Sequence, residues 1–185
     1  MRSILLVLGF AAALSSPASG ADDVGARRDA VDVSMGVDEQ GHGVVRARTE
    51  IAASPEVVYR TLLDCDRAAR IMPGVRRCKV VSSGVEGEIR EHVVRFSVFL
   101  PPLRSTSRVT LEPNRQIRFT CIKGDIRACD GTWRLTPIDG GRRTQVAYDF
   151  WASPPFGLPV DLAGRMMRRD APAALEALRR ECERP

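Results

Sequence analysis

The sequence predicts an α+β fold in which a curved, mostly antiparallel sheet wraps around one long C-terminal helix. Segments that alternate apolar and polar residues outnumber helical segments, and they follow one another without the strand–helix alternation of a parallel sheet. Residues 160–182 add an apolar stripe at helical spacing. With 185 residues, 44% hydrophobic and 28% charged, the chain has the composition of one soluble domain, which excludes a disordered or multi-span membrane protein.

The N-terminus predicts a signal peptide over residues 1–21, a flexible segment over 22–28 and one ligand-binding domain over 29–183. Arg2 precedes an apolar run, residues 4–14, that is too short to cross a bilayer as a helix. Small residues, Ser19 and Ala21, then stand where a signal peptidase requires them. We therefore expect cleavage after Ala21 and a periplasmic or secreted protein.

The domain is expected to begin with a hairpin and two short helices. Residues 31–37 and 45–51 alternate in hydrophobicity and flank a turn at residues 39–41. Ser54 followed by Pro55 is typical of a helix start, since serine caps the free N–H groups and proline fits the first helical position. A second short helix is expected from Asp66, ending before Pro73.

A run of strands and a final helix complete the predicted order. The strands are expected from Val80 onward, then over residues 89–100, 105–111, 117–121, 129–135 and 145–150. Pro101 and Pro102 end the second of these because proline lacks the N–H that pairs strands. The helix over 160–182 contains Pro172, which we expect to kink it. A sheet curled around a helix commonly leaves a cavity between the two.

Charge and aromatic content argue against a nucleic-acid partner. Lys and Arg total 28 against 23 acidic residues, a net charge of +5, yet no basic run is long enough to form a tail. The aromatic fraction of 5% is low for a surface that stacks on bases. We interpret the excess of arginine in the C-terminal helix as a solvated face, with transient contact to a membrane surface as the alternative.

Five cysteines make disulfides a question, because disulfides persist in exported proteins. Cys121 and Cys129 flank an expected hairpin turn, and Cys65 and Cys78 flank the passage from helix to strand. Spacing alone decides neither pairing, since cysteine is also a common buried residue. An odd number leaves at least one thiol outside any intrachain bridge. No CxxC motif or metal cluster occurs, and no cofactor is expected.

The sequence offers little for catalysis. The GxSxG, HExxH, GxxxxGK[ST] and GxGxxG motifs are absent, which removes the usual support for hydrolase, zincin, P-loop and Rossmann functions. His42 lies in a glycine-flanked turn and is expected in solvent. His92 shares a strand face with Val94, so it points inward, either as a satisfied core residue or as a ligand contact. Asp64 and Asp66 adjoin a helix end and are expected to cap it.

Four segments resemble the coenzyme Q-binding START-domain proteins. Residues 123–135 resemble the strand signature of that family, residues 53–59 its first helix, 71–75 its proline-containing loop, and 149–159 the approach to its last helix. The signature positions are Gly124, Ile126, Gly131 and Trp133. The family lies within the SRPBCC superfamily of polyketide cyclases/dehydrases, START lipid-transfer domains and birch-pollen-type allergens. The resemblance implies a helix-grip fold with a deep apolar cavity for a lipid, quinone or polycyclic ligand.

The predicted ligand-binding residues are apolar or aromatic side chains on the inward faces of successive strands and on the last helix. They are Phe96, Val98, Phe119, Trp133, Tyr148, Phe150, Met166 and Met167. Met and aromatic side chains adapt to irregular apolar ligands, although the same residues also suit a filled core.

We expect an exported, non-enzymatic protein that binds or transfers a hydrophobic small molecule. One alternative is a cyclase or aromatase of the same superfamily, for which His92, Tyr148 and Arg95 would supply the acid or base. Another is an interaction protein, since some members resemble a toxin that binds the large ribosomal subunit. The leader argues against the last, because an exported protein does not meet ribosomes.

Overall fold

The computed structural model describes residues 30–85, 87–95, 99–126, 128–153 and 160–184. It confirms the α+β fold: one eight-stranded sheet, antiparallel throughout, with the strand order β1-β2-β8-β7-β6-β5-β4-β3. The strands are β1 (Asp32–Val37), β2 (Gly43–Ile51), β3 (Val75–Gly84), β4 (Gly87–Val94), β5 (Leu103–Glu112), β6 (Gln116–Gly124), β7 (Cys129–Ile138) and β8 (Arg143–Ala152). The predicted leader and the flexible segment lie outside the described residues.

Two short helices, α2 (Pro55–Leu63) and α3 (Ala68–Ile71), connect β2 to β3, and a 3-10 turn, η1 (Asp139–Gly141), joins β7 to β8. The side chain of Ser54 accepts a hydrogen bond from the Val57 amide, as the sequence predicted for the start of α2. The carboxylate of Asp64 accepts bonds from the amides of Asp66 and Arg67 beyond the end of that helix. Ser54 thus satisfies one of the N–H groups that the start of α2 leaves open, and Asp64 fixes the turn between α2 and α3.

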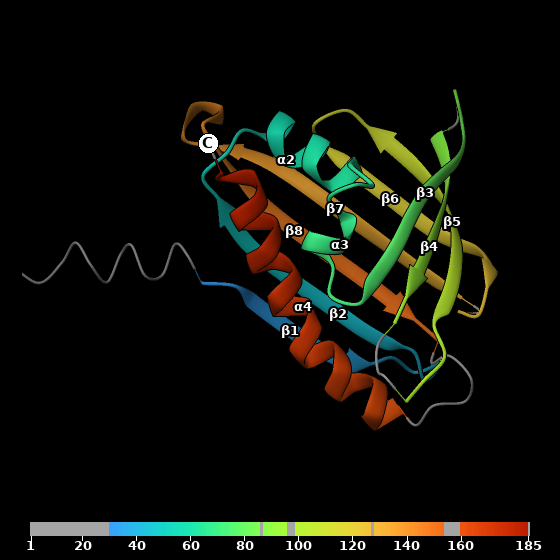
Figure 1. Ribbon diagram of the computed structural model, residues 1–185. Coiled ribbons are helices and arrows are strands. Elements are labelled where there is room, and N and C mark those ends of the chain that lie inside the picture. Colours follow the sequence, from blue (N-terminus) through green and yellow to red (C-terminus); the bar gives the residue numbers. More distant parts are fainter. Residues whose placement is uncertain (1–29, 86, 96–98, 127, 154–159, 185) are drawn as a thin grey trace, which may run out of the picture.

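The long helix α4 (Val160–Cys182) crosses the concave face of the sheet on the β1–β2 side, with α2 and α3 beside its C-terminal half (Figure 1). Its C-terminal half packs into the hydrophobic core through Leu175, Leu178 and Cys182, which are at most 6% exposed. The helix contains Pro172, as predicted, and a kink there stays a prediction. Its first turns lie at the opposite end of the molecule from the C-terminus (Figure 1).

The strand boundaries that differ most from those predicted are the start of β3 and the end of β4. Strand β3 begins at Val75 rather than Val80, because it is an edge strand whose residues are mostly exposed and so show little alternation. Strand β4 ends at Val94, well before the predicted Leu100. Among the described residues, no helix has the length and apolar character required to cross a membrane.

Candidate functional site

A cavity of about 300 Å³ lies between the first half of α4 and the concave face of the sheet. Strands β1, β2, β7 and β8 form its floor, and Met72 and Pro73 close it beside α3. Its aromatic and sulfur-containing lining consists of Met35, Met72, Trp133, Tyr148, Phe150, Met166 and Met167. The volume is at the lower end of the range for small-molecule sites, about 300 to 1,000 Å³.

The floor of the cavity is a row of aromatic rings that strand register brings together. Trp133 on β7 pairs with Tyr148 on β8, and their rings stack with centroids 4.0 Å apart. Phe150 follows Tyr148 on the same face, with ring centroids 6.0 Å apart. Stacked aromatic contacts stabilise the floor beyond the area that they bury.

Phe119 extends this row from β6 without lining the cavity itself. It pairs with Gly131 on β7, and its ring lies so close to that glycine that a Cβ there would come within 2.2 Å of it. Because Gly131 has no side chain, the Phe119 ring covers it and reaches Phe150, at a centroid distance of 6.0 Å. The glycine of the predicted signature therefore makes room for an aromatic support behind the floor.

The structure places five of the eight predicted site residues on the cavity wall. These are Trp133, Tyr148, Phe150, Met166 and Met167. Phe119 packs behind the wall, and Phe96 and Val98 lie outside the described residues. Ligand binding by these five residues stays a prediction.

Sequence reasoning missed several other wall residues. Met35 and Val45 belong to strands that were predicted to face inward, and Met72 and Pro73 belong to the loop of the family resemblance. Ala171 and Ala174 lie on the apolar stripe of α4 and leave the space that larger residues would fill. The alternation of the strands and the apolar stripe of α4 could have suggested these residues. Neither pattern shows where the helix and the sheet leave a space between them.

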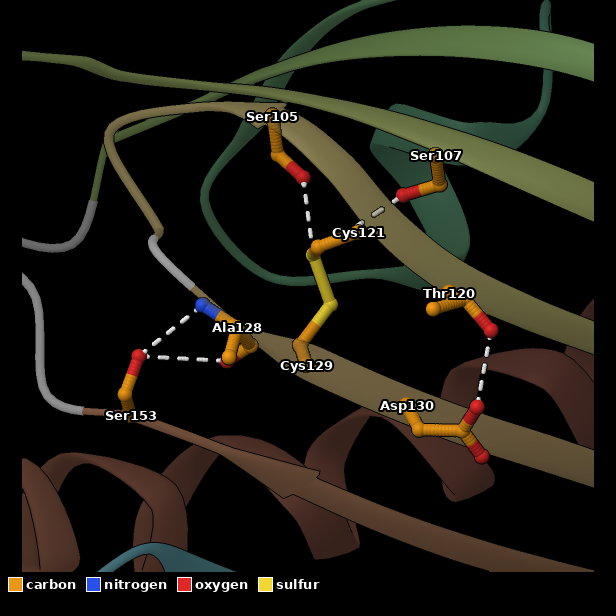
Figure 2. The surroundings of a disulfide bond; sticks show 8 residues. All are labelled: Ser105, Ser107, Thr120, Cys121, Ala128, Cys129, Asp130 and Ser153. Carbon is orange, nitrogen blue, oxygen red and sulfur yellow. Dashed lines mark hydrogen bonds between the residues drawn. A yellow bond between two sulfur atoms is a disulfide. The ribbon is translucent and has the colours of Figure 1, made fainter.

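The turn between β6 and β7 forms one lip of the cavity, where Ile126 lines the wall. Figure 2 shows its base, where Cys121 on β6 and Cys129 on β7 form a disulfide. Next to the turn, the amide of Ala128 donates to the hydroxyl of Ser153 over 3.0 Å, and the Ser153 amide donates to the Ala128 carbonyl over 2.9 Å. The β6–β7 turn is therefore hydrogen-bonded to the end of β8, and the disulfide links the two strands at its base.

Gly124 anchors the other side of the same turn. Its φ of +125° and its approach to the Arg104 carbonyl, 2.3 Å from where a Cβ would stand, leave room for glycine alone. The Asp125 amide donates to that carbonyl over 2.8 Å, and the Arg104 amide donates to the Asp125 carboxylate over 2.7 Å. The second candidate pairing that the sequence left open, Cys65 with Cys78, is also present as a disulfide, and Cys182 is a buried free cysteine.

A second part of the concave face, on β4 and β5, is polar and lies outside the cavity lining. Arg90, 6% exposed, donates from Nε to the Glu88 carboxylate over 2.7 Å. His92 follows on the same face, and its register partner Ser105 is buried, as is Ser107 opposite Arg90. Burial, with a smaller contribution from the positive charge of Arg90, lowers the pKa of His92.

The candidate acids and bases are therefore dispersed. Tyr148 lines the cavity, and burial raises the pKa of its hydroxyl far above the ordinary value, so it stays neutral. His92 faces inward but stands on the polar strands, and Arg95 is exposed. The three residues considered for an enzyme do not converge on the cavity. Within the described ranges, no group of three or more His, Cys, Asp or Glu side chains is arranged to hold a metal ion.

Comparison with known proteins identifies the family. Residues 51–179 match the family described as polyketide cyclase / dehydrase and lipid transport. The chain belongs to this family. Its fold is the START-type helix-grip fold. The resemblance stated from the sequence is therefore confirmed for the superfamily, while binding of coenzyme Q is not shown.

Solved structures with this fold include both enzymes and lipid-transfer proteins. The Zhui aromatase/cyclase from Streptomyces sp. R1128 is 23% identical, with a TM-score of 0.65 over 77% of this chain and 94% of that chain. A STAR-related lipid transfer protein from Xanthomonas axonopodis is 20% identical, with a TM-score of 0.64 over 82% and 99%. A START superfamily protein from Mycobacterium smegmatis is 18% identical, with a TM-score of 0.65 over 77% and 98%. At these identities the likeness shows the fold alone.

Proposed function

We propose that this protein is an exported, non-enzymatic carrier that holds a hydrophobic small molecule of the lipid or quinone class under α4. The observation that carries the proposal is the apolar cavity with its aromatic and methionine lining. Burying an apolar ligand there contributes about 0.8 kcal/mol for each CH₂ group removed from water, before the costs of association. Membership of a family that binds hydrophobic small molecules supports the same function.

The export part of the proposal rests on the N-terminal sequence and is supported by the two disulfides. Residues 1–21 have the features of a cleaved signal peptide. Disulfides persist in the periplasm and outside the cell and are rare in the cytosol. The periplasm or the extracellular space is therefore the proposed location.

Native mass spectrometry of the protein from the exported fraction, followed by organic extraction, tests the carrier function. We expect an apolar molecule to co-purify. Ala171→Leu with Ala174→Leu fills the cavity from α4 and should abolish that occupancy, whereas Ala173→Leu, which is not a wall position, should retain it. A chain that carries nothing and takes up nothing from a lipid extract would contradict the proposal.

A cyclase or aromatase is the second candidate, favoured by the polar strands beside the cavity. Glu88, Arg90 and His92 provide charged and titratable groups on the same concave face. Turnover of a linear polyketide that is lost in both His92→Gln and Tyr148→Phe would establish an enzyme. The absence of turnover, together with a bound apolar molecule, would leave the carrier.

A further inference from the structure

We propose that the end of the molecule at which the cavity opens docks on an anionic lipid bilayer, an inference that rests on the proposed carrier function. This mouth surface consists of the β1–β2 turn, residues 99–102 before β5, residues 125, 126 and 128 between β6 and β7, and the first described turns of α4. Strand order brings these segments together, since β2, β5 and β7 begin, and β1, β4, β6 and β8 end, at this one edge (Figure 1).

Hydrogen bonds and shared cavity lining hold the parts of the mouth surface together. The Arg104 and Asp125 bonds tie the start of β5 to the β6–β7 turn, and the Ala128 and Ser153 bonds tie that turn to the end of β8. Val37, Ile126 and Arg168 all line the cavity, although they come from a turn on each side of the sheet and from α4. Because Val37 and Arg168 are exposed members of the lining, we place the opening of the cavity at the mouth surface.

Exposed apolar side chains project from this end. Phe99 is 92% exposed and Val37 is 57% exposed, and Pro101 and Pro102 beside Phe99 are also exposed. Exposing large apolar side chains at turn tips to water is unfavourable, whereas burying them at the boundary between lipid headgroups and acyl chains is favourable.

Cations without ion-pair partners surround these tips. Arg95, Arg104, Lys123, Arg165 and Arg168 are exposed, or partly so, and make no ion pair within the described part of the chain. Three carboxylates at this end are engaged internally: Asp38 by His42, Asp125 by the Arg104 amide, and Asp170 by Arg169. Glu39 in the β1–β2 turn is exposed and offsets one of the five cations. The mouth surface thus presents a surplus of positive charge.

The far end of the molecule also exposes an apolar side chain, Val85 in the β3–β4 turn, but it differs in its charge. Its arginines are matched by carboxylates, as in the pairs Arg143 with Glu50 and Arg184 with Glu181. Arg115 and Arg142 are exposed there without ion pairs in the described structure, but Glu112, Asp139 and Glu50 stand on the adjoining strands and turn.

Positive charge next to apolar tips suits a negatively charged bilayer, which attracts each nearby cation by about 1 kcal/mol.

Docking through the mouth surface would place the opening of the cavity against the bilayer. A ligand that leaves the cavity at the mouth surface would pass directly into acyl chains and would not cross water. An anionic lipid bilayer fits this surface better than an acidic protein does, because apolar tips and dispersed cations match a fluid interface without specific pairing.

Co-sedimentation with vesicles tests the inference, with the protein isolated from the exported fraction as its cell processes it. One vesicle is phosphatidylcholine, and the other adds about 30% phosphatidylglycerol, so that only surface charge differs. We expect binding to the anionic vesicle, reduced at least tenfold by Lys123→Gln with Arg165→Gln and several-fold by Phe99→Ser. Arg115→Gln with Arg142→Gln removes the same charge from the far end and should change binding less than twofold.

Equal loss in the two double variants, equal binding to both vesicles, or no binding would overturn the inference. A concentration-dependent dimer that Phe99→Ser dissolves, without vesicle binding, would assign the surface to a second copy of the chain. Occupancy measured without vesicles separates the two proposals. A loaded protein that ignores vesicles overturns the docking surface alone, and an empty protein that binds them overturns the carrier function alone.

Discussion

The concave face of the sheet has two halves, one that buries apolar side chains around a cavity and one that buries polar side chains. Under α4, strands β1, β2, β7 and β8 present aliphatic, aromatic and methionine side chains around an open volume. On β4 and β5 the same face buries Arg90, Ser105 and Ser107, each at most 7% exposed. An apolar wall tolerates an empty space, whereas a buried polar group requires a partner. The difference favours the space under α4 as the proposed ligand site and gives the polar half a structural role.

Breaking the ion pair of the polar half should have the largest effect. Arg90→Leu leaves the mostly buried Glu88 carboxylate without its cation, and we expect the free energy of unfolding in urea to fall by about 3 to 5 kcal/mol. Glu88→Leu with Arg90→Leu removes both charges and should recover most of that loss. The double variant should also keep the ligand, because neither residue lines the cavity.

Loss of the ligand in the stable double variant would place the polar half in the binding site. An unchanged urea midpoint in Arg90→Leu would show that the pair carries no structural role. Either result would remove the distinction between the two halves.

The disulfides should have the next largest effect, and one of them joins the halves. Cys121 contacts Ser105 of the polar strands, with oxygen and sulfur 3.4 Å apart, while Cys129 lies on β7 beside the cavity floor (Figure 2). Removing a bridge that closes 8 or 13 residues should lower the unfolding free energy by about 2.5 or about 3 kcal/mol. Cys121→Ala with Cys129→Ala and Cys65→Ala with Cys78→Ala test the two separately.

Thiol titration of the unmodified protein provides the control. The remaining cysteine, Cys182, is buried, and burial raises the pKa of its thiol to about 11, so it should react only after unfolding. One thiol for each denatured, unreduced chain is expected, and five after reduction. Three or more before reduction would mean that a bridge is absent.

Local patterns predicted the elements well because each carries its signal in adjacent residues. The Ser54–Pro55 start of α2 and the alternation of β2 needed no tertiary information. The predicted start of β3 was wrong, since this edge strand exposes most of its residues and loses the alternation that marks a buried strand. The predicted end of β4 was wrong because the alternation in the sequence continues past Val94, where the strand ends. Alternation finds strands only where one face is covered.

The site was predictable in its chemistry but not in its outline. Aromatic residues on inward faces marked Trp133, Tyr148 and Phe150, whereas Ala171 and Ala174 matter by being small, which a stripe of apolar residues does not reveal. The buried Glu88–Arg90 pair was also missed, because two charged residues at alternate positions of a strand are typical of a solvated face. Only the register that sets Arg90 opposite Ser107 on the concave side shows otherwise.

The smallest expected effect is a dependence of stability on pH that originates in the polar half. Burial lowers the pKa of His92 in the folded protein below its ordinary value of about 6.5, so the unfolded chain binds a proton there before the folded chain does. Stability contributed by His92 is therefore complete above pH 6.5 and falls as the pH drops toward the folded pKa, by at most about 1.4 kcal/mol for each pH unit. Urea unfolding between pH 7.5 and about pH 5 should record this decline.

His92→Gln should flatten the profile, since glutamine does not titrate, while His42→Gln should leave the decline in place because His42 lies in the β1–β2 turn, against Asp38, far from the polar half. Ligand occupancy should stay constant over the same pH range in all three proteins, because Tyr148 remains neutral and His92 does not line the cavity. Ligand release on acidification that His92→Gln prevents would contradict this. It would mean that the polar half controls the apolar one, and that the two halves of the concave face form a single site.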